Sequence, residues 1–430
     1  MNRYSKINVN YGIRVYPVTS KGEDGMCKYF NVEGACNPVE HYMVALNKRL
    51  RQIKVLVDQG KYFSISRARQ YGKTTTLGAL EEYLHDDYIV IGMDFQLLSH
   101  DDFVNESAFI AAFSREILAT VSGEKYIPEY IHERLTAFVE GSESAMKLAL
   151  LFNCLSDWCS KSEKPIVLMI DEVDSATNNQ VFLDFLAQLR GYFIHRKKRP
   201  TFQSVILSGV YDIKNLKRKI SPDVEHKSNS PWNIAADFDV EMSFSTTEIS
   251  EMLMEYENDY KTSMNIEYMA NLIYDYTSGY PFLVSRICKI IDEKVTGTKG
   301  FADRREAWSK KGFLTAVNIL QSEKNTLFES LVNKLSDFPE LREIVYTLLF
   351  HGKSVPFNPL NKAIEIAAMF GFVKESEGTV VVANRVFETV LYNLFLSEEV
   401  MQSAIYNVAL QNKNQFIKNG ILVSERNKNE

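Results

Sequence analysis

The chain has 430 residues, more than one hydrophobic core usually supports, so two or three domains are expected. A formal net charge of -6 gives no general attraction for nucleic acid or an anionic membrane, although local basic patches could still provide one. No apolar run approaches the roughly 20 residues that span a bilayer, and the five cysteines form no CxxC pair, which argues against a disulfide framework or a zinc site and predicts a cytoplasmic protein.

The first half of the chain predicts an α/β unit at 37–245, after an irregular lead-in at 1–36. Apolar runs predict strands at 62–66, 87–95, 165–170, 204–209 and 238–244. Helical patterns lie before the first strand, at about 45–59, and between the strands, at about 77–84, 102–160 and 178–194. Because most of the strands are apolar throughout and alternate with helices, we expect a five-stranded parallel sheet covered on both faces. The run 238–244 alternates apolar and polar residues, which favours an edge strand.

The loop after the first expected strand has the pattern of a phosphate-binding loop. Gly72, Lys73 and Thr74 stand where a tight loop opens a helix, and there backbone N–H groups can cradle phosphates. In such loops the lysine reaches the β- and γ-phosphates and the next hydroxyl binds Mg²⁺. The residues predicted to bind a nucleotide are Arg67, Ala68, Arg69, Gln70, Tyr71, Gly72, Lys73, Thr74 and Thr75.

Arg67 departs from the usual pattern, because G-x-x-x-x-G-K-[ST] has its first glycine at that position. A guanidinium of Arg67 or Arg69 would add positive charge beside the phosphates. It would equally fit the sequence if it pointed outward and only replaced the glycine. Both interpretations stay open, so the loop needs support from the rest of the chain.

Asp171 and Glu172 provide that support, because they end the apolar run 165–170. A carboxylate at the end of a neighbouring strand can hold Mg²⁺ directly or through its water, so Thr74 and Asp171 are the predicted metal ligands. Glu172 can orient and partly deprotonate an attacking water. Both motifs lie at the carboxyl ends of expected strands, where α/β sheets bind ligands. The sequence therefore predicts a Mg²⁺-dependent nucleotide site, with hydrolysis resting on the placement of Glu172.

Two further catalytic candidates lie near the fourth expected strand. Ser208 ends that strand and is placed to touch the γ-phosphate or the water, or else to bond a nearby backbone group. Basic runs at 195–199 and 214–219 flank the strand. They are interpreted as solvated surface, as contacts to a nucleic-acid backbone, or as the source of an arginine that stabilises transition-state charge, for which Arg218 is the candidate.

The residue pattern of the second half of the chain predicts mainly helices. We expect a helical lid at 246–311, a further unit at 312–400 and a tail at 401–430. Helices at about 325–334, 339–351 and 359–370, followed by a hairpin at 371–382, have the order of a winged helix. The helix that would read DNA offers only Asn361, Lys362 and Glu365 as polar groups. We therefore favour packing against protein over DNA binding.

Three stretches together, RARQYGKTTT at 67–76, VLMIDEVD at 167–174 and SGYP at 278–281, resemble the bacterial AAA-like ATPases. This family belongs to the STAND and archaeal-ATPase branch of P-loop NTPases, in which the first Walker glycine is often replaced. The resemblance covers about 30–400 and implies ATP binding. It also implies that Gly279 and Pro281 of a Gly-x-Pro motif approach the nucleotide and that 40–44, with Tyr42, covers the adenine. Many relatives continue into a nuclease-like domain, but the Asp…Glu-x-Lys pattern is missing after 400, so we expect either no nuclease function in this polypeptide or a truncated relative of the nuclease-bearing proteins.

We therefore expect a P-loop NTPase that binds ATP and Mg²⁺ and hydrolyses ATP to drive a conformational switch in a regulatory or signalling role. A protein partner or self-association is expected, and no membrane. One alternative is a nucleotide-locked interaction module with negligible turnover. Another is a DNA-binding regulator that acts through the winged helix, which the sequence supports least.

Overall fold

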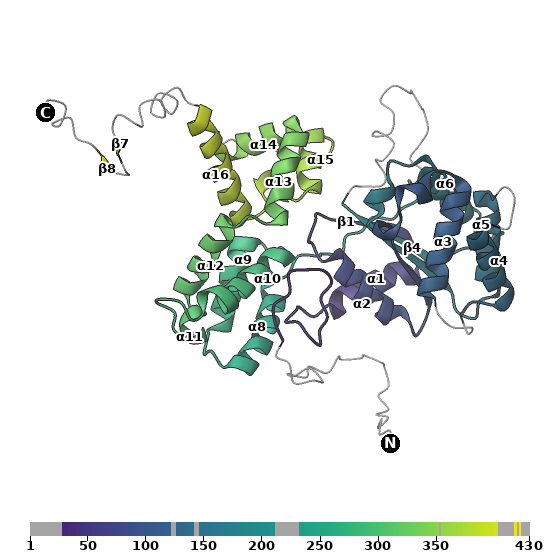
Figure 1. Cartoon of the computed structure of the whole chain (residues 1–430), viewed down its shortest axis with the longest axis horizontal. Helices are drawn as coiled ribbons and strands as arrows, with labels where there is room; N and C mark the ends of the chain where they lie inside the picture. Colours follow the sequence, from purple (N-terminus) through teal and green to yellow (C-terminus); the bar gives the residue numbers. More distant parts are fainter. Residues whose placement is uncertain are drawn as a thin grey trace, which may run out of the picture.

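A computed structural model describes residues 28–121, 126–141, 146–210, 232–351 and 354–402, with two short strands at 417–418 and 421–422. An α/β unit lies beside a largely helical half of the molecule (Figure 1). The α/β unit contains a four-stranded parallel sheet in the order β1-β4-β3-β2. Its strands are β1 (Tyr62–Ser66), β2 (Ile89–Asp94), β3 (Ile166–Asp171) and β4 (Ser204–Gly209).

Helices cover both faces of this sheet. They are α1 (Asn47–Asp58), α2 (Lys73–Leu84), α3 (Glu106–Thr120), α4 (Glu129–Glu140), α5 (Leu148–Lys161) and α6 (Gln180–Ile194), with 3₁₀ turns η1 (Phe95–Leu97), η2 (His100–Phe103) and η3 (Val173–Ala176). Successive side chains of β3 alternate between two hydrophobic cores, so Met169 joins the core with α1 and α2 while Leu168 and Ile170 join the core with α3 to α6. The expected parallel sheet is therefore covered on both faces.

The predicted fifth strand is wrong within the described residues, because 238–244 makes no strand pairing. Ala236 forms a single parallel bridge with Phe63 of β1, and the chain then leaves the sheet edge. Side chains take the place of a ladder: Arg67 donates to the Val240 carbonyl at 3.2 Å, and Arg49 donates to the carbonyls of 241 and 242 at 3.1 and 3.0 Å. Backbone groups that side chains satisfy in this way are not available to a neighbouring strand.

The helical half begins with a group of helices that we call the lid. It contains α8 (Thr246–Tyr260), α9 (Ile266–Thr277), α10 (Pro281–Ile290), the π-turn η5 (Ile291–Val295), α11 (Arg304–Ala307) and α12 (Lys310–Ser322). The Ser245 hydroxyl and the Glu248 carboxylate form a capping box that starts α8. The predicted boundary after residue 311 falls inside α12, and the other domain boundaries stay predictions.

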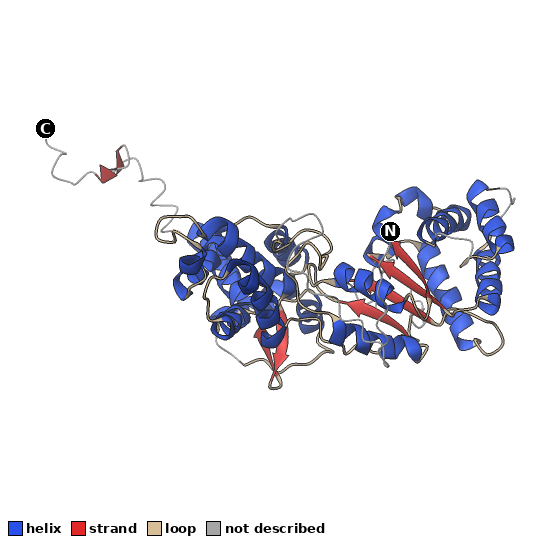
Figure 2. Ribbon diagram, turned by 90° about the horizontal axis from the view of Figure 1, so that it is seen from below, coloured by secondary structure: helices blue, strands red, loops and turns tan. Residues whose placement is uncertain are grey.

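The C-terminal unit carries the expected helices and hairpin. Its elements are α13 (Thr326–Asp337), α14 (Pro339–Phe350), α15 (Lys362–Met369), β5 (Val373–Ser376), β6 (Thr379–Val382) and α16 (Arg385–Gln402), followed by β7 (Ile417–Lys418) and β8 (Ile421–Leu422). The antiparallel hairpin β5–β6 stands apart from the main sheet in Figure 2. Its assignment as the wing of a winged helix stays a prediction.

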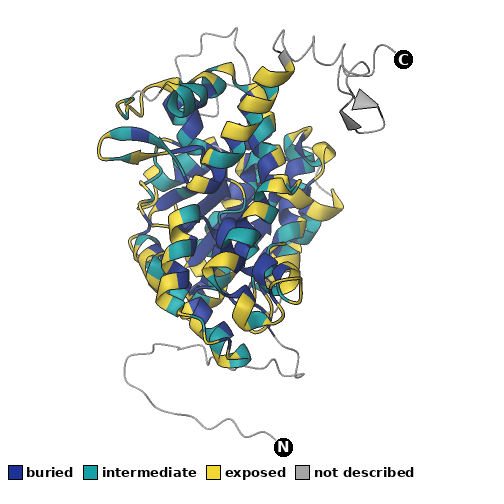
Figure 3. Ribbon diagram, turned by 90° about the vertical axis from the view of Figure 1, so that its left-hand side faces the viewer, coloured by how far each residue is buried: buried dark blue, intermediate teal, exposed yellow. Residues whose placement is uncertain are grey.

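One of the two cores links all of these parts. It runs from the α1 and α2 face of the sheet through the lid into α13 to α16, whereas the other core is confined to the α/β unit. Figure 3 shows buried residues in dark blue through the interior of the molecule. In the described part of the chain, no helix is both long and apolar enough to cross a membrane.

Candidate nucleotide-binding site

The loop between β1 and α2 folds around the side chain of Lys73. Gly72 has a φ of +78°, a left-handed conformation that glycine adopts without strain, and it caps α2. Lys73 is only 5% exposed, and its Nζ donates to the carbonyls of Arg67 and Ala68 at 3.1 Å each. These are long, weakly directional contacts for an ammonium, so phosphate oxygens can replace them at small cost.

Thr74 and Asp171 meet beside this lysine. The Thr74 hydroxyl donates to Oδ2 of Asp171 at 2.7 Å, and the backbone N–H of Glu172 donates to the other carboxylate oxygen at 2.9 Å. β4 lies between β1 and β3, so the register brings the phosphate-binding loop and the acidic pair to the same carboxyl edge of the sheet. The two predicted metal ligands are therefore in direct contact.

Burial and charge act on Lys73 and Glu172 in opposite ways. Burial lowers the pKa of Lys73, and the carboxylates of Glu172, Asp171 and Asp174 partly oppose that shift. Burial raises the pKa of Glu172, and the charge of Lys73 partly opposes it. A carboxylate with a raised pKa is a stronger base than an exposed glutamate, which suits it to accept a proton from water.

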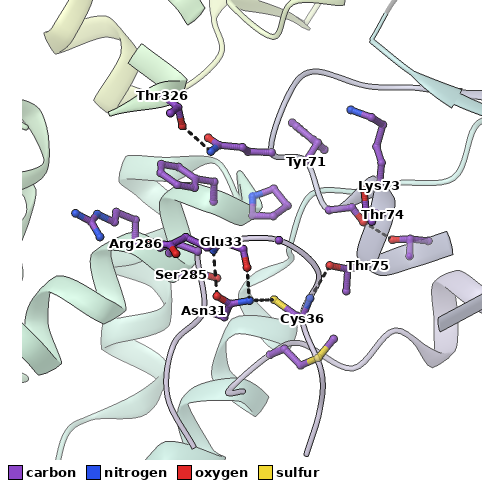
Figure 4. Close-up of a pocket in the computed structure, with 18 of the residues that line it drawn as sticks. Asn31, Glu33, Cys36, Tyr71, Lys73, Thr74, Thr75, Ser285, Arg286 and Thr326 are labelled. Atoms are coloured by element: carbon purple, nitrogen blue, oxygen red, sulfur yellow. Dashed lines mark hydrogen bonds between the residues drawn. The ribbon is translucent and has the colours of Figure 1, made fainter. Parts of the chain in front are cut away.

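A cavity of about 860 Å³ opens in front of the loop. Figure 4 shows Lys73 and Thr74 on one side of it and Ser285 and Arg286 of α10 on the other. Its apolar wall comes from Met43, Val44, Leu46, Phe244, Pro281 and Phe282. The lining therefore offers apolar side chains that suit a nucleotide base and cationic and hydroxyl groups that suit its phosphates.

A second, smaller cavity of about 330 Å³ lies between the sheet edge and the C-terminal unit. Glu172 lines both cavities. Arg69, Asp174 and Tyr280 line the smaller one together with residues of α13. Water reaching Glu172 from this side would therefore pass between the phosphate-binding loop and α13.

The two loop arginines diverge. The guanidinium of Arg67 donates to the carbonyls of Ser66 and Val240, at 3.0 and 3.2 Å, and does not line the larger cavity. Arg69 lines the smaller cavity. Gln70 has a positive φ of 57° and donates from Nε2 to the Thr326 hydroxyl of α13 at 3.1 Å.

Of the other predicted loop residues, Tyr71 and Thr75 line the larger cavity and Ala68 does not. Tyr71 lines it while its hydroxyl shares a hydrogen bond with Ser243 at 2.7 Å. The Thr75 hydroxyl accepts from the backbone N–H of Cys36 at 3.0 Å. Ala68 is buried, and its carbonyl holds Lys73.

Several predicted residues do not line the larger cavity, namely Arg67, Ala68, Arg69, Asp171, Gly279, Ser208 and Tyr42. Ser208 is fully buried on β4, its hydroxyl has no partner among the described residues, and the next pair in the β3–β4 register is Asp171 with Ser208. Arg218 falls outside the described residues. Tyr42 packs in the core and donates to Asp259 at 2.7 Å, while its neighbours Met43 and Val44 line the cavity. The adenine prediction therefore fits those two neighbours better than Tyr42.

The Gly-Tyr-Pro motif joins the lid to the loop. A Cβ on Gly279 would stand 2.0 Å from the Phe244 carbonyl oxygen, so only glycine fits there. Pro281 starts α10 and lines the larger cavity. The buried Tyr280 hydroxyl donates to the Arg69 carbonyl, and its ring packs edge-on against Tyr71 with centroids 4.7 Å apart.

Sequence patterns gave no hint of two other walls of the cavity. One is the loop 31–36, which Asn31 closes by donating to the carbonyls of residues 33 and 35 at 2.8 and 3.3 Å. The other is the start of α13, with Asn325 and Thr326. Neither carries a phosphate motif, although Asn325 followed by Thr326 has the form of a helix cap.

The donors at the loop suit Mg²⁺ in their chemistry. Hydroxyl and carboxylate oxygens are the ligands that Mg²⁺ prefers, and the ion is usually held by one or two side chains plus phosphates and water. Across the described residues, no group of three or more His, Cys, Asp or Glu side chains could hold a metal ion by itself. Thr74 and Asp171 would hold the ion only together with a phosphate ligand.

The fold and this site define a P-loop nucleotide-binding protein of the α/β class. The chain matches the model of the AAA-like domain over residues 40–397, and it belongs to that family. No curated protein matches the chain.

Solved structures are similar in fold. A Walker-type ATPase of Pyrococcus abyssi has a TM-score of 0.52 at 14% identity, with 84% of this chain and 99% of that chain covered. The ORC2 protein of Aeropyrum pernix, described in complexes with ADPNP and ADP, has a TM-score of 0.46 at 12% identity, covering 84% and 97%. At these identities the first likeness shows the fold alone.

Proposed function

We propose that the protein is a Mg²⁺-dependent ATPase whose lid and C-terminal unit respond to the bound nucleotide. The observation that carries this proposal is the 2.7 Å hydrogen bond from Thr74 to Asp171, beside a buried Lys73 whose hydrogen bonds within the described residues go to two loop carbonyls. Family membership supports nucleotide binding and hydrolysis in general.

The chain's own groups divide the work. Lys73 exchanges its carbonyl partners for oxygens of the β- and γ-phosphates. Thr74 and Asp171 would hold Mg²⁺, which would neutralise charge on the phosphate oxygens when bound. Glu172 accepts the proton of a water whose oxygen bonds to the γ-phosphorus while the bond to the β–γ bridging oxygen breaks, giving ADP and inorganic phosphate.

Contacts between the loop and the helical half support the switch. Tyr280 of the lid bonds the Arg69 carbonyl, and Gln70 bonds Thr326 of α13 at 3.1 Å. Lys374 of the hairpin donates to Ser278 beside the Gly-Tyr-Pro motif at 2.9 Å. A loop that changes its partners when phosphate binds therefore alters contacts with both the lid and the C-terminal unit.

The decisive test compares Glu172→Gln with the natural protein in MgATP binding and in hydrolysis. We expect unchanged binding and a kcat that falls by about 100-fold, as loss of a general base does. Glu163→Gln is the matched control, because this exposed carboxylate precedes β3 at the opposite edge of the sheet and should leave both unchanged.

Removal of Mg²⁺ with a chelator should abolish hydrolysis as well. If the natural protein hydrolyses ATP no faster than Glu172→Gln while both bind it equally, the nucleotide-locked interaction module is the better account. Absence of ATP binding would reject both functions.

A further inference from the structure

Arg69 is a cation of the phosphate-binding loop that has no side-chain partner in the part of the chain that the structure describes. Among the described residues, no hydrogen bond, ion pair or ring contact involves its guanidinium, and the residue is exposed. The guanidinium of Arg67, two positions earlier, donates to the Ser66 and Val240 carbonyls and lies over the face of Phe238, 5.5 Å from the ring centroid. The loop therefore has one arginine that holds structure and one that is free to bind a ligand.

The position of Arg69 at the smaller cavity indicates which ligand its guanidinium would bind. It lines the smaller cavity together with Glu172, the residue that also borders the larger, nucleotide-sized cavity. A terminal phosphate held by Lys73 and Thr74 would lie against Glu172, with the smaller cavity on the side from which water arrives. A guanidinium at that boundary lies where negative charge develops on the γ-phosphate oxygens.

The other cation of the smaller cavity is already engaged. The ammonium of Lys334 lies 5.1 Å and 5.7 Å from the ring centroids of Phe370 and Phe338, and it pairs with Asp337 at 3.3 Å. Arg69 directly follows Ala68, whose carbonyl accepts a hydrogen bond from Lys73 at 3.1 Å, so the arginine extends from the same turn of the loop that holds the phosphate-binding lysine.

We propose that Arg69 is a catalytic residue that contacts the γ-phosphate from within the same chain and stabilises the charge of the transition state. We infer further that Tyr280 is its positioning residue, because the buried phenol donates to the Arg69 carbonyl and fixes the backbone from which the guanidinium extends. Both inferences rest on the proposed ATPase function.

The test measures affinity for MgADP and for a non-hydrolysable β,γ-imido analogue of ATP, together with kcat. In Arg69→Ala we expect about tenfold weaker binding of the analogue, ADP binding within about twofold, and a kcat lower by about 100-fold, the size of effect seen when one donor to a transition state is removed. Arg69→Lys should recover part of the loss, since it restores the charge without the planar fork.

Lys334→Ala is the matched control, because it removes the other cation of the same cavity and should leave the ratio of analogue to ADP affinity unchanged. Tyr280→Phe should lower that ratio less than Arg69→Ala, and it should have no further effect on the ratio in the Arg69→Ala background, as a double-mutant cycle requires of a positioning residue.

An Arg69→Ala protein with the same affinity ratio and kcat as Lys334→Ala would overturn the inference. If the natural protein binds both nucleotides but does not hydrolyse ATP, the proposed hydrolysis fails, and a changed ratio in Arg69→Ala still supports contact with the terminal phosphate. If the natural protein binds neither nucleotide, both proposals fail together.

Discussion

The two faces of the sheet have different partners. On the face with α3 to α6, the core is confined to the α/β unit and is built largely from phenylalanines that pack on one another. On the face with α1 and α2, the core continues through the lid into the C-terminal unit. The first face can serve as a rigid support for the site, whereas the second connects the site to everything that follows it in the chain.

This difference predicts which contacts would change when a nucleotide binds. The phosphate-binding loop opens α2, which packs into the continuous core, and Tyr280 and Thr326 reach the same loop from the lid and α13. A change in the loop therefore acts on hydrogen bonds to the lid and α13 on one side and on a packed scaffold on the other. Four predictions test this difference between the two faces.

The largest effects are expected from emptying each core in turn. Phe185 is fully buried among Phe109, Phe113 and Phe152, with ring centroids 5.1 to 5.4 Å away, and Phe313 of α12 is fully buried beside Tyr276 at 5.1 Å. Either residue changed to alanine should cost about 3–5 kcal/mol of unfolding free energy.

The two variants should differ in their response to nucleotide. Phe185→Ala should keep the rise in thermal midpoint that saturating MgATP gives the natural protein, whereas Phe313→Ala should lose much of that rise because its cavity lies in the linked core. Equal nucleotide responses in thermal unfolding experiments would show that the two faces do not differ in this way.

Gly279→Ala should have the next largest effect. The added Cβ would stand 2.0 Å from the Phe244 oxygen, and the φ of +71° is unfavourable for alanine. The lid should therefore separate from the segment at 244, with a loss of about 2–4 kcal/mol in unfolding free energy and weaker nucleotide binding.

Gly141→Ala provides the control for Gly279→Ala. Gly141 has a similar φ of +66° but nothing within 4 Å of an added Cβ, so only the backbone cost of about 1 kcal/mol is expected. If the two alanine variants were equally stable and bound nucleotide equally well, the close approach at Gly279 would have no role in holding the lid.

The pH dependence of hydrolysis should report the environment of Glu172. Burial raises its pKa above the ordinary value of 4.5, and the ionised form is needed to accept a proton. The rate should therefore fall as pH drops through this raised pKa, with an acidic limb of kcat/KM that lies above pH 4.5 and a slope of about tenfold per pH unit.

The affinity for MgATP should not follow the same limb, because Glu172 is not expected to hold the phosphates. An acidic limb at or below pH 4.5 would contradict the burial of the catalytic carboxylate. A limb shared by binding and rate would instead assign it to nucleotide binding.

The smallest effect is expected at the hairpin. Lys374→Ala removes the 2.9 Å hydrogen bond that this exposed lysine donates to the Ser278 hydroxyl. A loss of about 0.5–1 kcal/mol is expected, measured as faster proteolysis of the C-terminal unit without nucleotide. Lys197→Ala, an exposed position of the basic run, should leave proteolysis unchanged, and equal behaviour of the two would remove the hairpin from the coupling.

Local sequence patterns were enough to predict the strands, helices and turns whose formation depends on neighbouring residues. The apolar runs predicted all four strands of the sheet, and Gly72-Lys73-Thr74 with Asp171 predicted a pair that lies in hydrogen-bond contact. Both motifs are short, and each lies at the end of a strand whose mostly apolar composition indicates that it is buried on both faces. The helices and hairpin of the C-terminal unit were predicted for the same reason, since their periodicity and turn residues are local.

The contacts that distinguish residues of the same type became known only from the folded structure. Arg67 and Arg69 are two arginines of one loop, yet they have different surroundings. The guanidinium of Arg67 donates to the Val240 carbonyl, whereas Arg69, whose carbonyl accepts from Tyr280, lines a cavity together with Glu172. The run 238–244 has strand-like alternation, yet arginines from α1 and the loop occupy its carbonyls. In each case the deciding partner lies more than 150 residues away in the chain, where local patterns carry no information.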